Sequence, residues 1–170
     1  YPSNVLSVTT PATPVTDLAS FVSQLVPSLT MTTGTSQNVS VTMRNDGTAS
    51  WSSATGYHLY SQNPAGNTNW GLSQAPVVGS IIPNGNAVFS FSISAPSTAG
   101  TYNFQWRMRH TTTEFGSQSQ NVSIVVSPPV STGNTYYISP TGVDSTSGGS
   151  SAAPWRTFGF SVPKLQAGDT

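Results

Sequence analysis

The chain has 170 residues, no cysteine and a formal net charge of zero, with five Lys and Arg against five Asp and Glu. Charged residues make up 6 % of the sequence, against about 25 % in ordinary soluble proteins. The missing cysteines exclude disulfides, thiolate catalysis and thiolate metal sites. A neutral surface argues against nucleic acid as the main partner, and no apolar run reaches the roughly 20 residues that span a bilayer, so we expect no membrane insertion.

The N-terminal segment, residues 1–16, holds three prolines among Ser and Thr. This composition fits a stiff, extended linker or arm and an ordinary flexible terminus about equally. The chain begins at Tyr1 without a signal peptide, which suggests a processed or excised piece. Richness in Thr, Ser and Asn, with little Lys, favours an exported protein of bacterial type, located outside the cell or on its surface.

Residues 17–127 read as short strands separated by turns. Apolar and polar residues alternate, the period of a strand with one buried face, and turn-forming residues such as "NDG" and "PNGN" separate the runs. About seven strands are expected, within residues 18–26, 37–47, 56–62, 75–82, 87–96, 100–110 and 119–127, and no convincing helix. Sheets with one apolar face must pack against each other, so the fold class is all-β, an immunoglobulin-like sandwich flanked by linkers.

The stretch "GTYNFQWRMRH", Gly100 to His110, alternates without interruption. One face carries the apolar side chains of Tyr102, Phe104, Trp106 and Met108. The other face carries Asn103, Gln105, Arg107 and Arg109. The apolar set predicts core residues, and the polar set is best read as a solvated face. If this protein contacts a glycan or another protein, Arg107 and Arg109 are candidate binding residues, because guanidinium groups form hydrogen bonds in a fixed planar fork. Glu114 is expected to pair with Arg109 or His110.

A family resemblance rests on "RNDGTASW", "SAPSTAGTYNFQWRMRH" and "EFG". These motifs resemble the four-tryptophan immunoglobulin-like domain, which is known from an autophagy cargo receptor and is widespread in bacterial secreted proteins. The resemblance covers about residues 17–127. Trp51 and Trp106 match two of the family's tryptophans, Trp70 is the third, and the fourth position falls in "TTTEFG", which has no Trp. The resemblance implies an interaction module without catalytic residues and a structural Trp51.

The composition changes again at Pro128. Residues 128–135 form a second linker, and "SPTGVDS", "APWRTF" and "AGDT" within residues 136–170 resemble the beginning of a right-handed parallel β-helix of the pectate-lyase-like kind. In that family the catalytic groups lie on later coils, so this segment is expected to be an incomplete β-helix start. Its apolar residues are too many to leave in water. We expect residues 136–170 to pack against another chain or the sandwich, with at most a short helical turn near Thr157.

Candidate site residues are few. The five carboxylates form no catalytic pair, Asp144 is read as a turn residue rather than a Ca²⁺ ligand, and His58 and His110 lack metal-ligand spacing. We therefore expect no enzyme activity, no cofactor and no metal. Trp70, in a polar loop, and Tyr57 are candidates for stacking on a sugar. The "NVS" triplets at Asn38 and Asn121 match the glycosylation sequon, and their modification is left open.

Three classes of function remain. The first is a non-catalytic binding or spacer module that contacts a glycan or a protein. The second is a structural subunit of an extracellular filament or surface assembly, which self-associates through residues 1–16 or 136–170. The third is a fragment of a polysaccharide lyase or hydrolase whose catalytic part lies elsewhere. The core residues Trp51, Trp106, Tyr102 and Phe104 are expected to be structural in all three.

Overall fold

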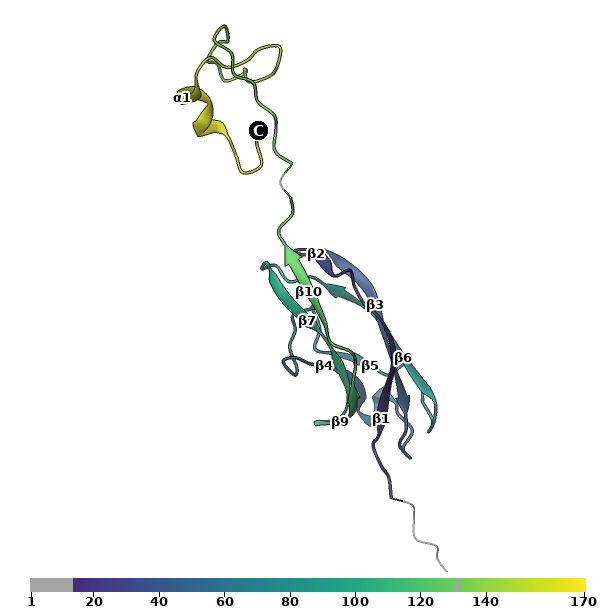
Figure 1. Ribbon diagram of the computed structural model, residues 1–170. Coiled ribbons are helices and arrows are strands. Elements are labelled where there is room, and N and C mark those ends of the chain that lie inside the picture. Colours follow the sequence, from purple (N-terminus) through teal and green to yellow (C-terminus); the bar gives the residue numbers. More distant parts are fainter. Residues whose placement is uncertain (1–13, 131) are drawn as a thin grey trace, which may run out of the picture. The chain divides into compact units, whose positions relative to one another are not determined.

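The computed structural model describes residues 14–130 and 132–170. The chain divides into two compact units after Pro128, and each is described here by itself. The first unit is built almost entirely of β-strands, and the second has little regular structure (Figure 1). Within the described residues, no helix is long and apolar enough to cross a membrane. Most of the proposed linker at 1–16 lies outside the described residues; its last part, Pro14 to Thr16, forms hydrogen bonds with Thr48.

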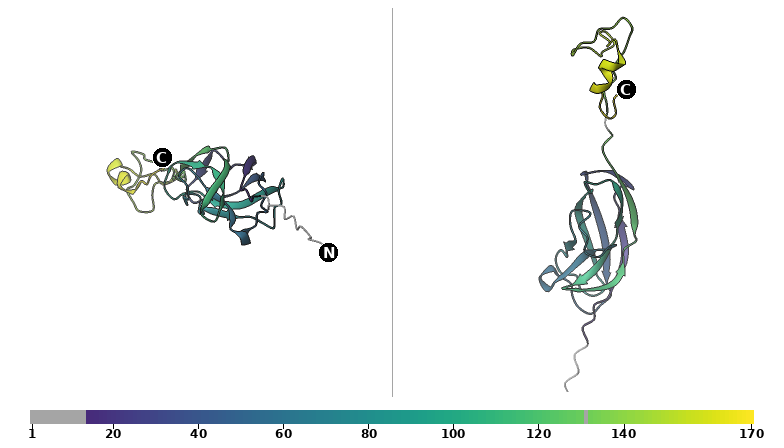
Figure 2. Two further views of the ribbon diagram at one scale, coloured as in Figure 1. Left: turned by 90° about the horizontal axis from the view of Figure 1, so that it is seen from below. Right: turned by 90° about the vertical axis from the view of Figure 1, so that its left-hand side faces the viewer.

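Among its described residues, the first unit contains ten strands and one short 3₁₀ helix, η1 (Ser53–Thr55). The strands are β1 (Ala19–Leu25), β2 (Thr30–Thr32), β3 (Ser36–Asn45), β4 (Tyr57–Ser61), β5 (Gln74–Pro76), β6 (Asn86–Ser94), β7 (Gly100–Phe104), β8 (Trp106–His110), β9 (Thr113–Gln118) and β10 (Val122–Ser127). They form three sheets, ordered β1-β3-β6, β2-β10-β7 and β5-β4-β8-β9. The first sheet forms one layer of the sandwich and the other two form the second layer (Figures 1 and 2).

The core lies between these layers because each strand turns its apolar positions inward. On β3 the buried apolar side chains are Val39, Val41 and Met43, and the residues between them are more exposed. The paired strand β6 contributes Phe89 and Ile93 in the same way. Burial of a large apolar side chain stabilises the fold by roughly 1.5–3 kcal/mol. With no disulfide available, this repeated burial is the main source of stability.

The stretch from Gly100 to His110 alternates without a break in the sequence, but in the structure it forms two strands, β7 and β8. β7 pairs with β10, whereas β8 pairs with β4 and β9, and Gln105 separates them. The carbonyl of Gln105 accepts from the backbone N–H of Gln62 at 2.8 Å, and the N–H of Trp106 donates to the Ser119 hydroxyl at 3.0 Å. These bonds fix the backbone at the point where the chain leaves the sheet of β7 and enters the sheet of β8.

The expectation of about seven strands was therefore too low. The split at Gln105 adds one strand, and the short β2 and the strand β9 add two more. β9 begins within "TTTEFG", which lay outside the expected strands, because the turn at Thr111 takes a left-handed backbone (φ 50°) and returns the chain at once. The expected strand at 75–82 is shorter, with Ile81 forming only an isolated bridge to Trp51.

A buried asparagine closes the end of β3. Asn45 is completely buried, and its Nδ2 donates to the carbonyls of Ala49 at 2.7 Å and Ile81 at 3.1 Å. Its Oδ1 accepts from the N–H of Gly47 at 3.1 Å, the local bond that makes Asn a turn residue. Asn45 thus holds the following turn against the segment that pairs with Trp51.

The second unit is arranged around one aromatic pair. Trp155 is buried and stacks on Tyr136 with ring centroids 4.9 Å apart, and its Nε1 donates to the Ser145 carbonyl at 2.9 Å. Gly149 takes a φ of 98°, and a Cβ there would lie 2.9 Å from both rings. The short helix α1 (Phe158–Ser161), capped by the Thr157 hydroxyl, precedes the 3₁₀ helix η2 (Val162–Lys164). This is the short turn expected near Thr157.

Candidate functional site

The outward side of the sheet β5-β4-β8-β9 carries most of the polar groups singled out from the sequence. Its pairing register places side chains in two rows across the sheet. One row is Pro76, His58, Arg109 and Glu114, and the other is Gln74, Tyr60, Arg107 and Gln118. We call these eight residues the polar face. Their neighbours along the strands, such as Leu59 and Met108, point into the core and are completely buried.

Arg107 is held by groups on β9. Its Nε donates to the Gly116 carbonyl at 2.9 Å, and its Nη1 lies 3.8 Å from Glu114 Oε2. Both side chains are partly exposed, so this ion pair contributes at most about 1 kcal/mol. The expectation that Glu114 pairs with Arg109 or His110 was wrong. Its carboxylate pairs instead with Arg107, which lies diagonally across from it on β8.

Arg109 contacts an aromatic ring rather than a carboxylate. Its guanidinium carbon lies 4.1 Å from the centroid of the Tyr60 ring, a cation–π distance. The hydroxyl end of Tyr60 lies against Gly66, whose missing side chain leaves room for it. The Nε of Arg109 is buried and has no hydrogen-bond partner among the described residues. One donor on this face is therefore unsatisfied.

His58 supplies an unsatisfied acceptor in the neighbouring position. Its Nδ1 lies 3.2 Å from the Gly56 carbonyl, which can only accept, so Nδ1 carries the proton. In the neutral ring Nε2 is then an acceptor, and it too is buried without a partner among the described residues. Burial lowers the pKa of His58, and the charge of Arg109 adds to this. The ring borders a cavity of about 280 Å³, lined by Ser53, Tyr57, His58, Gln74 and Pro76.

The prediction that Trp70 and Tyr57 form a sugar-stacking surface was wrong. Trp70 is 2 % exposed, and its Nε1 donates to the Asn103 carbonyl at 2.8 Å. Its own carbonyl accepts from Ser94, so Trp70 joins its polar loop to β7 and to the end of β6. Tyr57 is 3 % exposed because the alternation of β4 turns it inward. A polar loop thus surrounds a buried ring, which local composition does not reveal.

Asp17, Tyr57 and His110 form a cluster that sequence reasoning missed. Asp17 Oδ2 accepts from His110 Nδ1 at 2.6 Å, and Oδ1 accepts from the Tyr57 hydroxyl at 2.5 Å. The Tyr57 and His110 rings stack with centroids 4.0 Å apart. Burial and the bond to Asp17 raise the pKa of the Tyr57 hydroxyl. These residues are up to 93 positions apart, so only the fold brings them together, and they fasten the beginning of the sandwich to β4 and β8.

The four proposed core aromatics differ in burial. Trp51, Trp106 and Phe104 are completely buried, whereas Tyr102 is half-buried and its hydroxyl donates to the Thr98 carbonyl at 2.9 Å. Phe115 lies in "TTTEFG" and packs edge-on against Trp51, with centroids 5.7 Å apart. A phenylalanine therefore completes the aromatic cluster at that position.

The remaining polar residues have structural partners. Asp144 accepts from the N–H groups of Arg156 and Thr157 and from the Thr157 hydroxyl, which lowers its pKa. Within the described part of the chain, no group of three metal-ligating side chains occurs. Asn38 and Asn121 are both exposed, on β3 and just before β10. Glycosylation at either residue stays a prediction.

Comparison with known proteins bears on the fold. A search of curated proteins finds none that matches the chain. The family model described as the Ig-like domain from next to BRCA1 gene matches residues 26–140, which is more than half of the chain. Its span begins next to β1 and ends beyond β10, so it includes the polar face. With its antiparallel strands in two layers, the chain therefore belongs to this family of Ig-like domains.

Proposed function

We propose that this chain is a non-catalytic binding module of an exported, bacterial-type protein, and that it binds through the polar face. The carrying observation is the gathering of His58, Tyr60, Arg107 and Arg109 on one outward sheet face. Two of the five cations of the chain lie there, although charge is scarce everywhere else. Conserved Ig-like scaffolds carry varied functions, so the function is argued from this face and not from the fold.

The finer family assignment is part of the proposal. Trp51, Trp70 and Trp106 are all buried in the sandwich, and Phe115 completes the aromatic cluster. This arrangement supports the four-tryptophan type of immunoglobulin-like domain with one tryptophan replaced. In such a module the tryptophans stabilise the sandwich, and binding falls to side chains on its surface.

The experiment compares the chain with a double variant, Arg107→Gln and Arg109→Gln, in retention by immobilised polysaccharides and by extracellular proteins. Binding by the parent chain and its loss in the double variant are expected. The matched control is Arg44→Gln, whose partner Asp46 lies 3.2 Å away at the end of β3. Retention that is equal in all three chains would refute the polar face as the binding surface. Turnover of pectin, alginate or another glycan would contradict a non-catalytic role.

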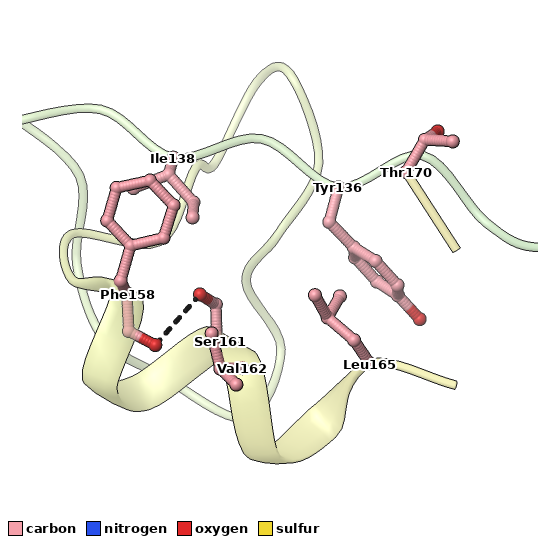
Figure 3. A pocket seen from close by; sticks show the side chains of 7 residues that line it. All are labelled: Tyr136, Ile138, Phe158, Ser161, Val162, Leu165 and Thr170. Carbon is pink, nitrogen blue, oxygen red and sulfur yellow. Dashed lines mark hydrogen bonds between the residues drawn. The ribbon is translucent and has the colours of Figure 1, made fainter. Parts of the chain in front are cut away.

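A second candidate function is a structural subunit that self-associates, and the C-terminal unit favours it. An apolar pocket of about 330 Å³ opens there between Tyr136, Ile138, Phe158, Val162 and Leu165 (Figure 3). Phe158 is 73 % exposed. Exposed apolar surface of this kind tends to find a partner. We expect sedimentation velocity to show concentration-dependent association that Phe158→Ser reduces and Val143→Ser, an exposed residue outside this pocket, does not. Association unaffected by Phe158→Ser would contradict this role.

We also propose that residues 136–170 are the beginning of a parallel β-helix. Ile138 forms a parallel bridge with Trp155. Next to it, the N–H of Tyr136 donates to the Thr170 carbonyl at 2.7 Å, and the N–H of Thr170 donates to the Asn134 carbonyl at 3.0 Å. The segment from Asn134 to Ser139 thus has extended chain beside it, as the first strand of a β-helix would. A stacked coil would cover the apolar pocket of Figure 3.

A further inference from the structure

The two unsatisfied atoms of the polar face point to the chemistry of its ligand. Arg109 Nε is a donor, His58 Nε2 is an acceptor, and the pairing of β4 with β8 places these two residues directly opposite each other. A buried polar atom without a partner costs free energy, so a group that satisfies both atoms at once is bound favourably. A pair of neighbouring hydroxyl groups does this, because a hydroxyl both donates and accepts.

An acidic ligand fits this face less well. Arg107 already contacts Glu114 and the Gly116 carbonyl. The Glu114 carboxylate lies in the same row as Arg109 and repels anions. The neighbouring positions in the two rows are Gln74, Pro76 and Gln118, which are neutral. One uncommitted guanidinium beside a carboxylate makes a polar site, not a strongly positive one.

A protein partner also fits poorly. Protein interfaces are usually anchored by protruding Trp, Tyr or Arg side chains. Here Trp70 and Tyr57 are buried, and the Tyr60 ring is covered by Arg109. The cavity beside His58 measures about 280 Å³, near the lower end of the roughly 300–1,000 Å³ of small-ligand sites. It offers the Ser53 hydroxyl and the Gln74 amide as further hydrogen-bonding groups.

We infer that the ligand is a neutral, hydroxyl-rich glycan, bound on the polar face over His58 and Arg109 and reaching into the cavity that His58 lines, with sugar hydroxyls donating to His58 Nε2 and accepting from Arg109 Nε. This inference rests on the proposed binding function. Both atoms are buried, so Arg109 must turn away from Tyr60 when the glycan binds. The same movement uncovers the Tyr60 ring, on which the apolar side of a sugar can stack.

The test titrates the full chain with neutral oligosaccharides, namely cello-, xylo- and manno-oligomers, and follows binding by calorimetry and by amide chemical shifts. Arg109→Lys keeps the charge but removes the Nε donor, and His58→Phe keeps a ring but removes the acceptor. Each is expected to weaken binding by about tenfold, which corresponds to about 1.4 kcal/mol. Arg44→Gln, on the other layer, should change the affinity less than twofold. Circular dichroism verifies that each variant is folded.

The same titration with an oligouronate and with a Glu-rich peptide separates the alternatives. Preference for either acidic probe, or full affinity of both Arg109→Lys and His58→Phe, would overturn the inference. If a protein binds at the polar face while the neutral oligosaccharides do not, the glycan inference fails and the proposed binding function stands. If nothing perturbs the amides of β4 and β8, both fail.

Discussion

The sandwich and the C-terminal unit each enclose a tryptophan, but they do so by different means. Trp106 lies between two layers and packs edge-on against Phe91 and Phe104, with centroids 4.9 and 5.8 Å away. Trp155 is covered by the stacked ring of Tyr136, by the ring of Phe160, which packs edge-on with centroids 6.0 Å apart, and by glycine backbone, and its Nε1 donates to the Ser145 carbonyl. Trp106 is thus buried between layers of paired strands, whereas Trp155 is buried in a unit with little regular structure.

This difference shows what strand alternation provides. In the sandwich, long strands such as β3 and β6 each add several inward side chains, so a neutral chain without disulfides still closes its own core. Among the described residues of the C-terminal unit, Trp155 is the one large apolar side chain that is buried. Seven others are exposed, namely Val130, Tyr137, Ile138, Val143, Phe158, Val162 and Leu165. A unit of about 40 residues rarely buries enough surface to be stable alone.

The largest effect is expected from Trp106→Ala. Truncation of a fully buried aromatic removes its contacts and leaves a cavity, which costs about 3–5 kcal/mol. Denaturant unfolding followed by circular dichroism measures the loss. Val88→Ala, at a position that is 56 % exposed on β6, serves as the control and should cost less than about 1 kcal/mol. Equal costs for the two variants would contradict the two-layer core.

Trp155→Ala sharpens the comparison because its effect should stay local. Among the described residues of its unit, Trp155 is the one buried ring, so we expect the unit to open and become sensitive to protease between residues 132 and 170. The unfolding midpoint of the sandwich should stay unchanged. Phe158→Ala removes an exposed aromatic from the same unit and should leave the cleavage rate nearly as it was. A lowered midpoint for the sandwich in Trp155→Ala would show that the two units depend on each other.

The smallest effect is a difference in acid sensitivity. His58 has a lowered pKa in the folded chain because it is buried. As the pH falls below the ordinary histidine value of about 6.5, the imidazole of His58 therefore becomes protonated in the unfolded chain before it does so in the folded chain. Sandwich stability from this group is therefore present above that pH and lost below it. The lowered pKa of Asp144 stabilises the C-terminal unit above about pH 4 and stops doing so in stronger acid.

Urea unfolding and limited proteolysis at several pH values measure these two slopes. His58→Gln should flatten the dependence of the sandwich between about pH 6.5 and 5, and Asp144→Asn should flatten that of the C-terminal unit at lower pH. These variants isolate each group from the other ionisable residues of the chain. A sandwich slope that survives His58→Gln would assign the effect to another residue.

Part of the fold was accessible from the sequence because it depends on periodicity. Alternation of apolar and polar residues indicated which side chains are buried, as at Val39, Val41 and Met43 and at Phe104, Trp106 and Met108. The turn at Asn45 to Gly47 was also visible, because Asn bonds to its own backbone. The break at Gln105 was not visible, because the alternation continues through it and only the pairing partners change.

The candidate site divides in the same way. Arg107 and Arg109 were assigned to an outward face from their spacing alone. Trp70 was misjudged because the polarity of its own loop says nothing about the β7 and β6 segments that cover it. The cluster of Asp17, Tyr57 and His110 had no local signal, because its members come from separate parts of the chain.

The sequence by itself determined the side that faces the core in its clearly alternating strands, such as β3, β6 and β8, since a strand places successive side chains on opposite sides. It also determined that no disulfide contributes, because the chain has no cysteine. Only the tertiary structure decided which polar groups meet. Strand register places His58 opposite Arg109 and brings Arg107 next to Glu114. Loop packing decides that Trp70 is buried. Both register and loop packing are set by contacts between residues far apart in the chain, for which local pattern carries no information.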